Sequence, residues 1–198
     1  MVDAAEFGVA RFVAIDFETT GSVPGFPNEP WQVGAVAVRA DGRTGPDSFF
    51  ESLLRIDPQR PFNRHAPGRH ARLRRELAAS PSLVETWPDL APLLAGPVVA
   101  HNAGTERSVL QSAAPLHVPG PWIDTLALAR RAWPHLPSHA LEDLAPALGL
   151  ERDLRALFPD RAPHDALYDA AACALVLLRL LREPGWESLS PVELAQLS

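Results

Sequence analysis

The chain has 198 residues, of which 46% are hydrophobic and 21% charged, and these proportions exclude a disordered or fibrous protein. Its net charge of −6 is opposite to the basic excess typical of nucleic-acid-binding proteins, and all 18 basic residues are arginine. The single cysteine, Cys173, excludes an internal disulfide and a zinc site built from cysteines, and no apolar run reaches the ~20 residues needed to cross a bilayer.

Short apolar runs bounded by turn residues predict five strands in the first two thirds of the chain. These strands cover residues 12–15, 33–38, 49–56, 97–100 and 122–123. The Asp41-Gly42 pair is typical of a tight hairpin turn, so we expect the second and third strands to be antiparallel.

Helical periodicity is found mainly after the third strand. It predicts helices over residues 83–94, 106–113, 125–133, 140–148 and 165–182. Asn102 and Ser138 stand where helix N-caps are expected, and Ser190-Pro191 is typical of a further helix start. Strands that come early and helices that alternate later favour an α/β domain with a mixed sheet.

Prolines are spread along the whole chain without a low-complexity linker or an internal repeat. We therefore expect one domain over residues 1–198, with a core at about 10–182 and a tail at 183–198. The acidic N-terminal residues do not resemble a secretory signal, which favours a reduced, cytoplasmic setting without a membrane partner.

Carboxylates and histidines gather at three separated places, each next to a predicted strand or helix end. They are Asp16 and Glu18 in residues 16–21, His101, Asn102 and Glu106 in residues 98–106, and His164, Asp165 and Asp169 in residues 164–169. Strand alternation places Asp16 and Glu18 on one face. Each place taken alone also has a simpler interpretation, either as solvated acids or as helix caps.

The order of these motifs resembles the DEDDh branch of the DnaQ-like 3′→5′ exonucleases. The motifs are DxE at a strand end, then HNxxxE, then HxxxxD before a long helix rich in alanine and leucine. Residues 31–38 are similar to the second strand of that family, and residues 123–130 and 138–144 are similar to two of its helical segments. The resemblance covers roughly residues 10–182 and implies a ribonuclease H-like fold, with a mixed five-stranded β-sheet flanked by α-helices.

The resemblance also implies the roles of individual residues. Asp16, Glu18, Glu106 and Asp169 match metal-binding carboxylates for two Mg²⁺ or Mn²⁺ ions, and His164 matches the general base, so these five form the expected catalytic set. The expected substrate contacts are Phe17, Thr19, Thr20, His101 and Asn102. Physical reasoning agrees on the metal, because carboxylates ~4–5 Å apart repel by roughly 3–4 kcal/mol per pair at an effective dielectric near 20.

One departure from the family pattern stands out in the second motif. The family usually has an aromatic residue followed by aspartate, whereas this chain has Thr105-Glu106. Glutamate is one methylene longer, so the geometry of the second metal and the substrate-side wall of the cleft are left open.

We therefore expect a metal-dependent 3′→5′ exonuclease that releases nucleoside 5′-monophosphates from the 3′ end of single-stranded nucleic acid, with DNA favoured. Two alternatives stay open: an RNA-directed exonuclease similar to oligoribonuclease or RNase T, and a non-catalytic nucleic-acid-binding module. A proofreading role would require a polymerase or other repair protein in trans, and the oligomeric state is open. The seven arginines between positions 55 and 75 fit either a basic nucleic-acid surface or a solvated loop and helix.

Overall fold

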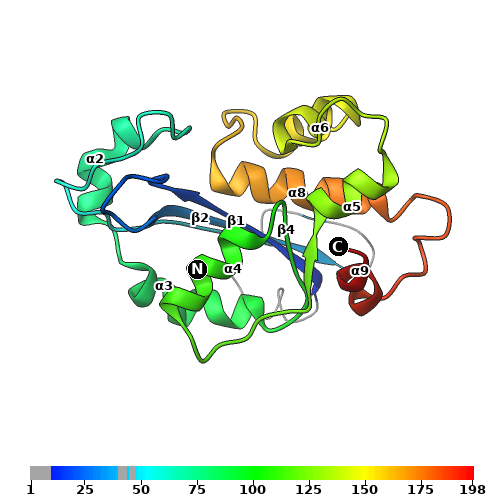
Figure 1. Ribbon diagram of the computed structural model, residues 1–198, viewed down its shortest axis with the longest axis horizontal. Helices are drawn as coiled ribbons and strands as arrows, with labels where there is room; N and C mark the ends of the chain where they lie inside the picture. Colours follow the sequence, from blue (N-terminus) through cyan, green and yellow to red (C-terminus); the bar gives the residue numbers. More distant parts are fainter. Residues whose placement is uncertain (1–9, 40–43, 45–47) are drawn as a thin grey trace.

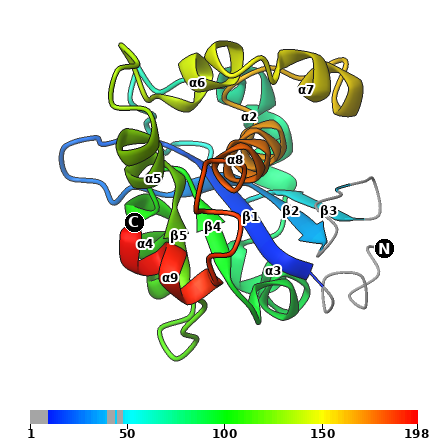
Figure 2. The same ribbon diagram turned by 90° about the vertical axis from the view of Figure 1, so that its right-hand side faces the viewer.

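The computed structural model describes residues 10–39, 44 and 48–198 of the chain. Within them, five strands form one sheet (Figure 1), in the order β3-β2-β1-β4-β5 that Figure 2 shows. The strands are β1 (Ala10–Thr19), β2 (Pro30–Arg39), β3 (Phe49–Leu53), β4 (Val98–Ala100) and β5 (Trp122–Asp124). The pairs β1–β2 and β2–β3 are antiparallel, whereas β4 is parallel to both β1 and β5. The predicted mixed sheet and its antiparallel second pair are confirmed, although the Asp41-Gly42 turn lies outside the described residues.

Helices cover both faces of this sheet (Figure 2). One face carries α8 with α5, α6 and α7 around it, and the other carries α3, the 3-10 turn η2 and α4. The helices are α2 (His70–Ala79), α3 (Leu83–Leu90), η2 (Ala91–Leu94), α4 (Gly104–Ala113), α5 (Thr125–Ala132), α6 (Leu141–Ala147), α7 (Glu151–Leu157), α8 (Ala166–Leu180) and α9 (Pro191–Leu197). None of the helices in the described ranges has the length and hydropathy required to span a membrane.

Alternation along β1 decides which helices its side chains meet. Phe12 and Ala14 point into the core that contains α8, whereas Val13 and its odd-numbered neighbours point into the core formed with α3 and α4. Asp16 and Glu18 continue the even-numbered series at the carboxyl end of the strand. The sequence pattern therefore places both carboxylates on the α8 side of the sheet.

Gly34 lets α8 approach β2 closely. A Cβ atom at this position would lie only 2.3 Å from the backbone carbon of Ala166 and from the backbone nitrogen of Leu167. Gly34 is also the pairing partner of Asp16 on β1. The missing side chain at Gly34 therefore brings the first turn of α8 beside the end of β1.

Two helices form where the sequence analysis predicted none. The helix α2 is rich in arginine and α7 spans only 7 residues, so neither has a strong apolar period to reveal it. The single helix expected over residues 83–94 is divided instead. The helix α3 runs through Pro88 to Leu90, and the 3-10 turn η2 follows with Pro92 in its first turn, where proline has no backbone N–H for an α-helical hydrogen bond.

The two predicted N-caps are wrong. The N-cap of α4 is Ala103, and Asn102 before it adopts the left-handed backbone with φ 66°; the N-cap of α6 is Ala140, two residues after Ser138. Asp124 caps α5, and its carboxylate also accepts hydrogen bonds from the backbone N–H groups of Asn102 (3.0 Å) and Ala103 (3.1 Å). An acid from the neighbouring parallel strand therefore binds backbone donors at the start of α4.

The C-terminal tail forms α9, and its predicted start is confirmed. Ser190 and Glu193 make a reciprocal capping box there. Leu194 is fully buried in the core on the α8 side, and α9 packs against β5 and α5. The tail therefore docks on the sheet domain itself.

Candidate active site

The carboxyl ends of β1 and β4 bring the first two motifs together. These strands are parallel neighbours, so the residues that follow them meet at one edge of the sheet. Glu18 is buried and Asp16 is partly exposed on β1, and His101 and Asn102 follow β4 directly. Glu106 lies in the first turn of α4 and is only 3% exposed.

The third motif reaches the same edge through the start of α8. Asp165 is the N-cap of this helix, which confirms the simpler interpretation of that residue. His164 adopts the left-handed backbone with φ 66°, and its N–H donates a hydrogen bond of 2.9 Å to Asp169 Oδ2. Its imidazole Nε2 lies 3.0 Å from Oε2 of Glu142 on α6.

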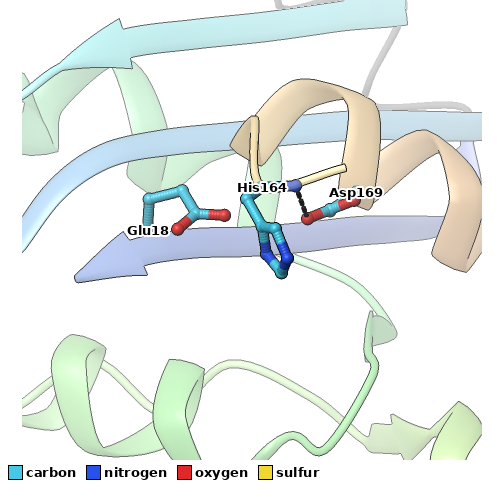
Figure 3. Close-up of side chains that lie close together, drawn as sticks. All are labelled: Glu18, His164 and Asp169. Atoms are coloured by element: carbon cyan, nitrogen blue, oxygen red, sulfur yellow. Dashed lines mark hydrogen bonds between the residues drawn. The ribbon is translucent and has the colours of Figure 1, made fainter. Parts of the chain in front are cut away.

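Glu18, His164 and Asp169 form the tightest group at this edge. One ligand atom from each of the three lies within 4.8 Å of the other two. Figure 3 shows the Glu18 and Asp169 carboxylates on either side of the His164 imidazole. Glu18 comes from β1 and the other two from the start of α8, so the fold joins residues about 150 positions apart in the chain.

Burial is the largest cause of a raised pKa at all four carboxyl groups of this cluster. It raises the pKa of Glu18 to about 8, of Glu106 to about 7 and of Asp169 to about 6. The pKa of Asp16 lies well above its usual value, because the negative charges of Asp169, Glu106 and Glu18 add to the effect of burial. Keeping all four groups ionised near neutral pH therefore requires positive charge.

The surroundings of the Glu106 carboxyl group show whether this cluster fits a divalent cation. Hydrogen bonds from the backbone of Glu106 itself and of Phe17 partly offset the burial of its carboxyl group. Its Oε2 atom is nevertheless buried and accepts no hydrogen bond from the described residues. A buried carboxylate oxygen without a donor, beside three other acids, fits a hard cation such as Mg²⁺ or Mn²⁺.

Two clefts meet at His164. One has a volume of about 480 Å³ and is lined by the end of β1, including Thr19, and by Gly21 after it. The other, of about 630 Å³, runs between α5 and α6 past Arg130. His101, Asn102 and His164 line both clefts, so an extended ligand has room on either side of the acidic cluster.

Four of the five predicted substrate contacts line these clefts, and Thr20 does not. Phe17, Thr19, His101 and Asn102 contribute to the walls. Thr20 is fully buried, and its hydroxyl accepts hydrogen bonds from the Glu29 N–H (3.1 Å) and from Arg60 Nη2 (3.2 Å). The expectation that Thr20 contacts substrate is therefore corrected: it supports the turn after β1.

His101 is held in the wall by both ring nitrogens. Nδ1 lies 3.0 Å from Thr125 Oγ1, and Nε2 lies 2.8 Å from the backbone oxygen of His139. Burial lowers its pKa, which favours the neutral ring. His101 is thus a fixed, neutral part of the cleft.

The arginine-rich stretch divides into paired and exposed residues. Arg55 pairs with Glu85, Arg60 with Glu29 and Arg69 with Asp165, and Arg74 stacks 4.0 Å over Phe62. Arg64, Arg72 and Arg75 are exposed and, unlike the exposed Arg55 and Arg69, form no ion pair with a described residue. Most of this stretch therefore stabilises the loop and α2, and the exposed three are the candidates for contact with a nucleic-acid backbone.

The sequence analysis missed several residues at the site. Asn63 and His65 line the smaller cleft from the loop before α2, and Glu142 contacts His164. Asn63 and His65 lie on a loop without regular periodicity, whereas Glu142 lies on α6, in a segment that the sequence predicted as helical without indicating a contact with His164.

Comparison with known proteins gives consistent matches. The sequence profile of the RNase_T family, described as "Exonuclease", matches residues 13–177. An Escherichia coli protein named "Exodeoxyribonuclease 10" is 33% identical over 134 residues, covering 66% of this chain and 54% of the relative. A Rhodobacter capsulatus protein named "DNA polymerase III subunit epsilon-like protein" is 30% identical over 174 residues, covering 86% of this chain and 23% of the relative. The chain thus spans about half or less of the length of these curated relatives.

Among solved structures, "Exonuclease X in complex with 5' overhanging duplex DNA" superposes with a TM-score of 0.67 at 28% identity, covering 94% of this chain and 98% of the other. Escherichia coli Exonuclease I in complex with a dT13 oligonucleotide matches with a TM-score of 0.66 at 17% identity, covering 87% of this chain and 41% of the other. The second likeness shows the fold alone.

Proposed function

The chain belongs to the RNase_T exonuclease family, and from this premise we propose that it is a metal-dependent 3′→5′ exonuclease that releases nucleoside 5′-monophosphates from single-stranded DNA ends. The observation that carries the proposal is the gathering of Asp16, Glu18, Glu106, His164 and Asp169 from three distant segments at one edge of the sheet. Such an acidic cluster beside a histidine supports phosphodiester hydrolysis.

The four carboxylates are the proposed holders of two divalent ions. When bound, these ions neutralise phosphate charge and make an attacking water more acidic. The charges of Asp169, Glu106 and Glu18 all raise the pKa of Asp16, so Asp16 belongs to the same acidic cluster and would contribute its carboxylate to the metal-binding set. Glu106 would hold one ion through its donor-free Oε2.

His164 is the proposed general base. Its imidazole lies beside Glu18 and Asp169, at the point where the two clefts meet, and it accepts the proton of the attacking water. The Glu142 carboxylate, 3.0 Å from Nε2, stabilises the imidazolium that results. The clefts hold the strand on both sides of the reacting bond.

A DNA substrate is supported by the relatives, whose printed names include an exodeoxyribonuclease and a nuclease bound to DNA. The name of the R. capsulatus relative supports a polymerase or other repair protein as a partner in trans. We keep the cytoplasmic setting expected from the sequence as part of this proposal.

The test is digestion of a single-stranded DNA that carries a free 3′ end and a label at its 5′ end. Mn²⁺ is the metal, and Asp16→Asn is the inactive control. We expect stepwise shortening by the wild type, with loss of turnover in Asp16→Asn and a 10²–10⁴-fold lower rate in His164→Ala. Binding without shortening would show a non-catalytic module instead. A matched RNA strand in the same assay separates a DNA enzyme from an RNA enzyme, and faster RNA digestion would refute the DNA assignment.

Contact of Arg64, Arg72 and Arg75 with the nucleic-acid backbone is tested by the salt dependence of binding to a single strand. Substituting Arg72 and Arg75 together by alanine should lower the salt slope by about 1–2. An unchanged slope would leave these residues as a solvated face.

A further inference from the structure

The backbone at His164 needs support from outside the acidic cluster. The left-handed conformation with φ 66° is unfavourable for a residue other than glycine, so the surrounding structure must hold it in place. The hydrogen bond from its N–H to Asp169 fixes only the amide group. The segment before α8 is held by further side chains that take no part in the chemistry proposed above.

Arg161, three residues before His164, is the centre of this support. Its Nη1 donates to Asp165 Oδ1 (2.7 Å) and Glu51 Oε1 (2.8 Å), and its Nη2 donates to Glu51 Oε2 (2.6 Å). Glu51 belongs to β3, so the planar guanidinium joins the loop before α8 to the sheet by a two-pronged ion pair.

Gln32 on β2 closes this arrangement. Its Nε2 donates to Glu51 Oε1 (2.8 Å), and its Oε1 accepts from the N–H of Ala166 (3.3 Å), which directly follows Asp165. Gln32 is fully buried and is the pairing partner of Glu18 on β1. The Arg161 network therefore ties the start of α8 to the part of the sheet that carries Glu18.

Arg161 is the cation that pairs with both acids of this network, Glu51 and Asp165, and it therefore fixes their positions relative to each other. Asp165 is only 3% exposed, and a buried carboxylate requires a paired cation. Arg69 also pairs with Asp165, but its side chain is about half exposed, and this ion pair does not link Asp165 to β3. Without Arg161, Glu51 would lose the cation that pairs with it, and Asp165 would keep only its ion pair with Arg69.

We propose that Arg161 is a positioning residue for hydrolysis: by holding Glu51 and Asp165 together, it sets the backbone of His164 and thereby the place of the imidazole beside Glu18. This inference rests on the proposed exonuclease function. Arg161 lines neither of the two clefts that meet at His164, so its effect reaches the substrate through His164.

Arg161→Ala is expected to lower kcat about 10–100-fold, as removal of a supporting residue around a site typically does, with KM changed less than about 2-fold. Arg161→Lys keeps the charge but loses the fork, so it should restore only part of the rate. Arg155→Ala is the matched control, because it removes an exposed arginine on α7 that takes no part in the network. It should stay within about 2-fold of wild type.

The deciding measurement combines Arg161→Ala with His164→Ala. If Arg161 acts through His164, its substitution should change the rate of the His164→Ala protein by less than about 2-fold. The same loss in both backgrounds would overturn the inference, because a general structural defect acts whether or not the imidazole is present.

Glu51→Gln replaces Arg161→Ala in this experiment if the Arg161→Ala protein does not fold. It removes the negative charge that pairs with Arg161 and keeps a side-chain oxygen that accepts the hydrogen bond from Gln32. The same pattern is expected, with kcat lowered in the wild-type background only. An unchanged kcat in Glu51→Gln or in folded Arg161→Ala would also overturn the inference. A wild-type chain that does not digest DNA or RNA would instead refute the proposed function itself.

Discussion

Substituting Gly34 by alanine tests whether close approach of α8 to the sheet assembles the active site. The added Cβ would lie 2.3 Å from two backbone atoms of Ala166 and Leu167, and 2.4 Å from the Ala166 oxygen, whereas ordinary contacts begin near 3.4 Å. Backbone of a helix start cannot rotate away as a side chain can. The first turn of α8 must therefore retreat by about 1 Å, taking His164 and Asp169 away from β1.

The expected cost follows from that displacement. Overpacking of this kind destabilises a protein by about 1–3 kcal/mol, and a 1 Å misplacement of reacting groups lowers a rate by about 10²-fold. Urea unfolding measures the first effect, and digestion of a labelled single strand measures the second. Gly96→Ala is the matched control, because a Cβ there meets nothing within 4 Å. A Gly34→Ala protein with wild-type stability and rate would refute the reasoning.

Four further predictions concern the acidic cluster, the shared cap Asp124 and the C-terminal tail. Mn²⁺ binding at pH 7 should release at least about one proton, because Glu18 with a pKa of about 8 is mostly protonated and Glu106 with a pKa of about 7 is half protonated. Calorimetry in buffers of different ionisation enthalpy measures this release, and a value of zero would contradict it. Glu18 and Glu106 bind their protons more tightly in the folded protein, so the resulting stabilisation is complete below pH ~4.5 and is lost as pH rises through 7–8. The Tm of the metal-free protein should therefore fall over this range, and Mn²⁺ should reverse the fall. Asp124→Ala removes the cap of α5 and two further hydrogen bonds, and should cost about 1–3 kcal/mol in urea unfolding, with Asp124→Asn costing less. Leu194→Ala should cost about 2–5 kcal/mol if α9 belongs to the core, against less than about 0.5 for exposed Val192→Ala, and equal values for the two would contradict the docking of the tail.

Local chemistry was enough for the sequence to predict much of this protein. Apolar runs predicted the five strands, and alternation placed Asp16 and Glu18 on one face, because the two-residue period of a strand is set by the backbone alone. The capping residues of α8 and α9 could also be predicted from the sequence, because the side chains of Asp165 and Ser190 accept hydrogen bonds from N–H groups only three residues further along the chain. The motif order indicated the family, whose profile matches most of the chain.

Only the tertiary structure decided which distant groups meet. The backbone N–H groups of Asn102 and Ala103 donate hydrogen bonds to Asp124 on the next parallel strand. The hydroxyl of Thr20 accepts a hydrogen bond from Arg60, 40 residues away in the sequence. Arg161 reaches Glu51 across 110 residues of sequence. Such partners have no fixed spacing, because their contacts depend on how the sheet and helices pack, and packing combines many weak interactions that no local pattern encodes.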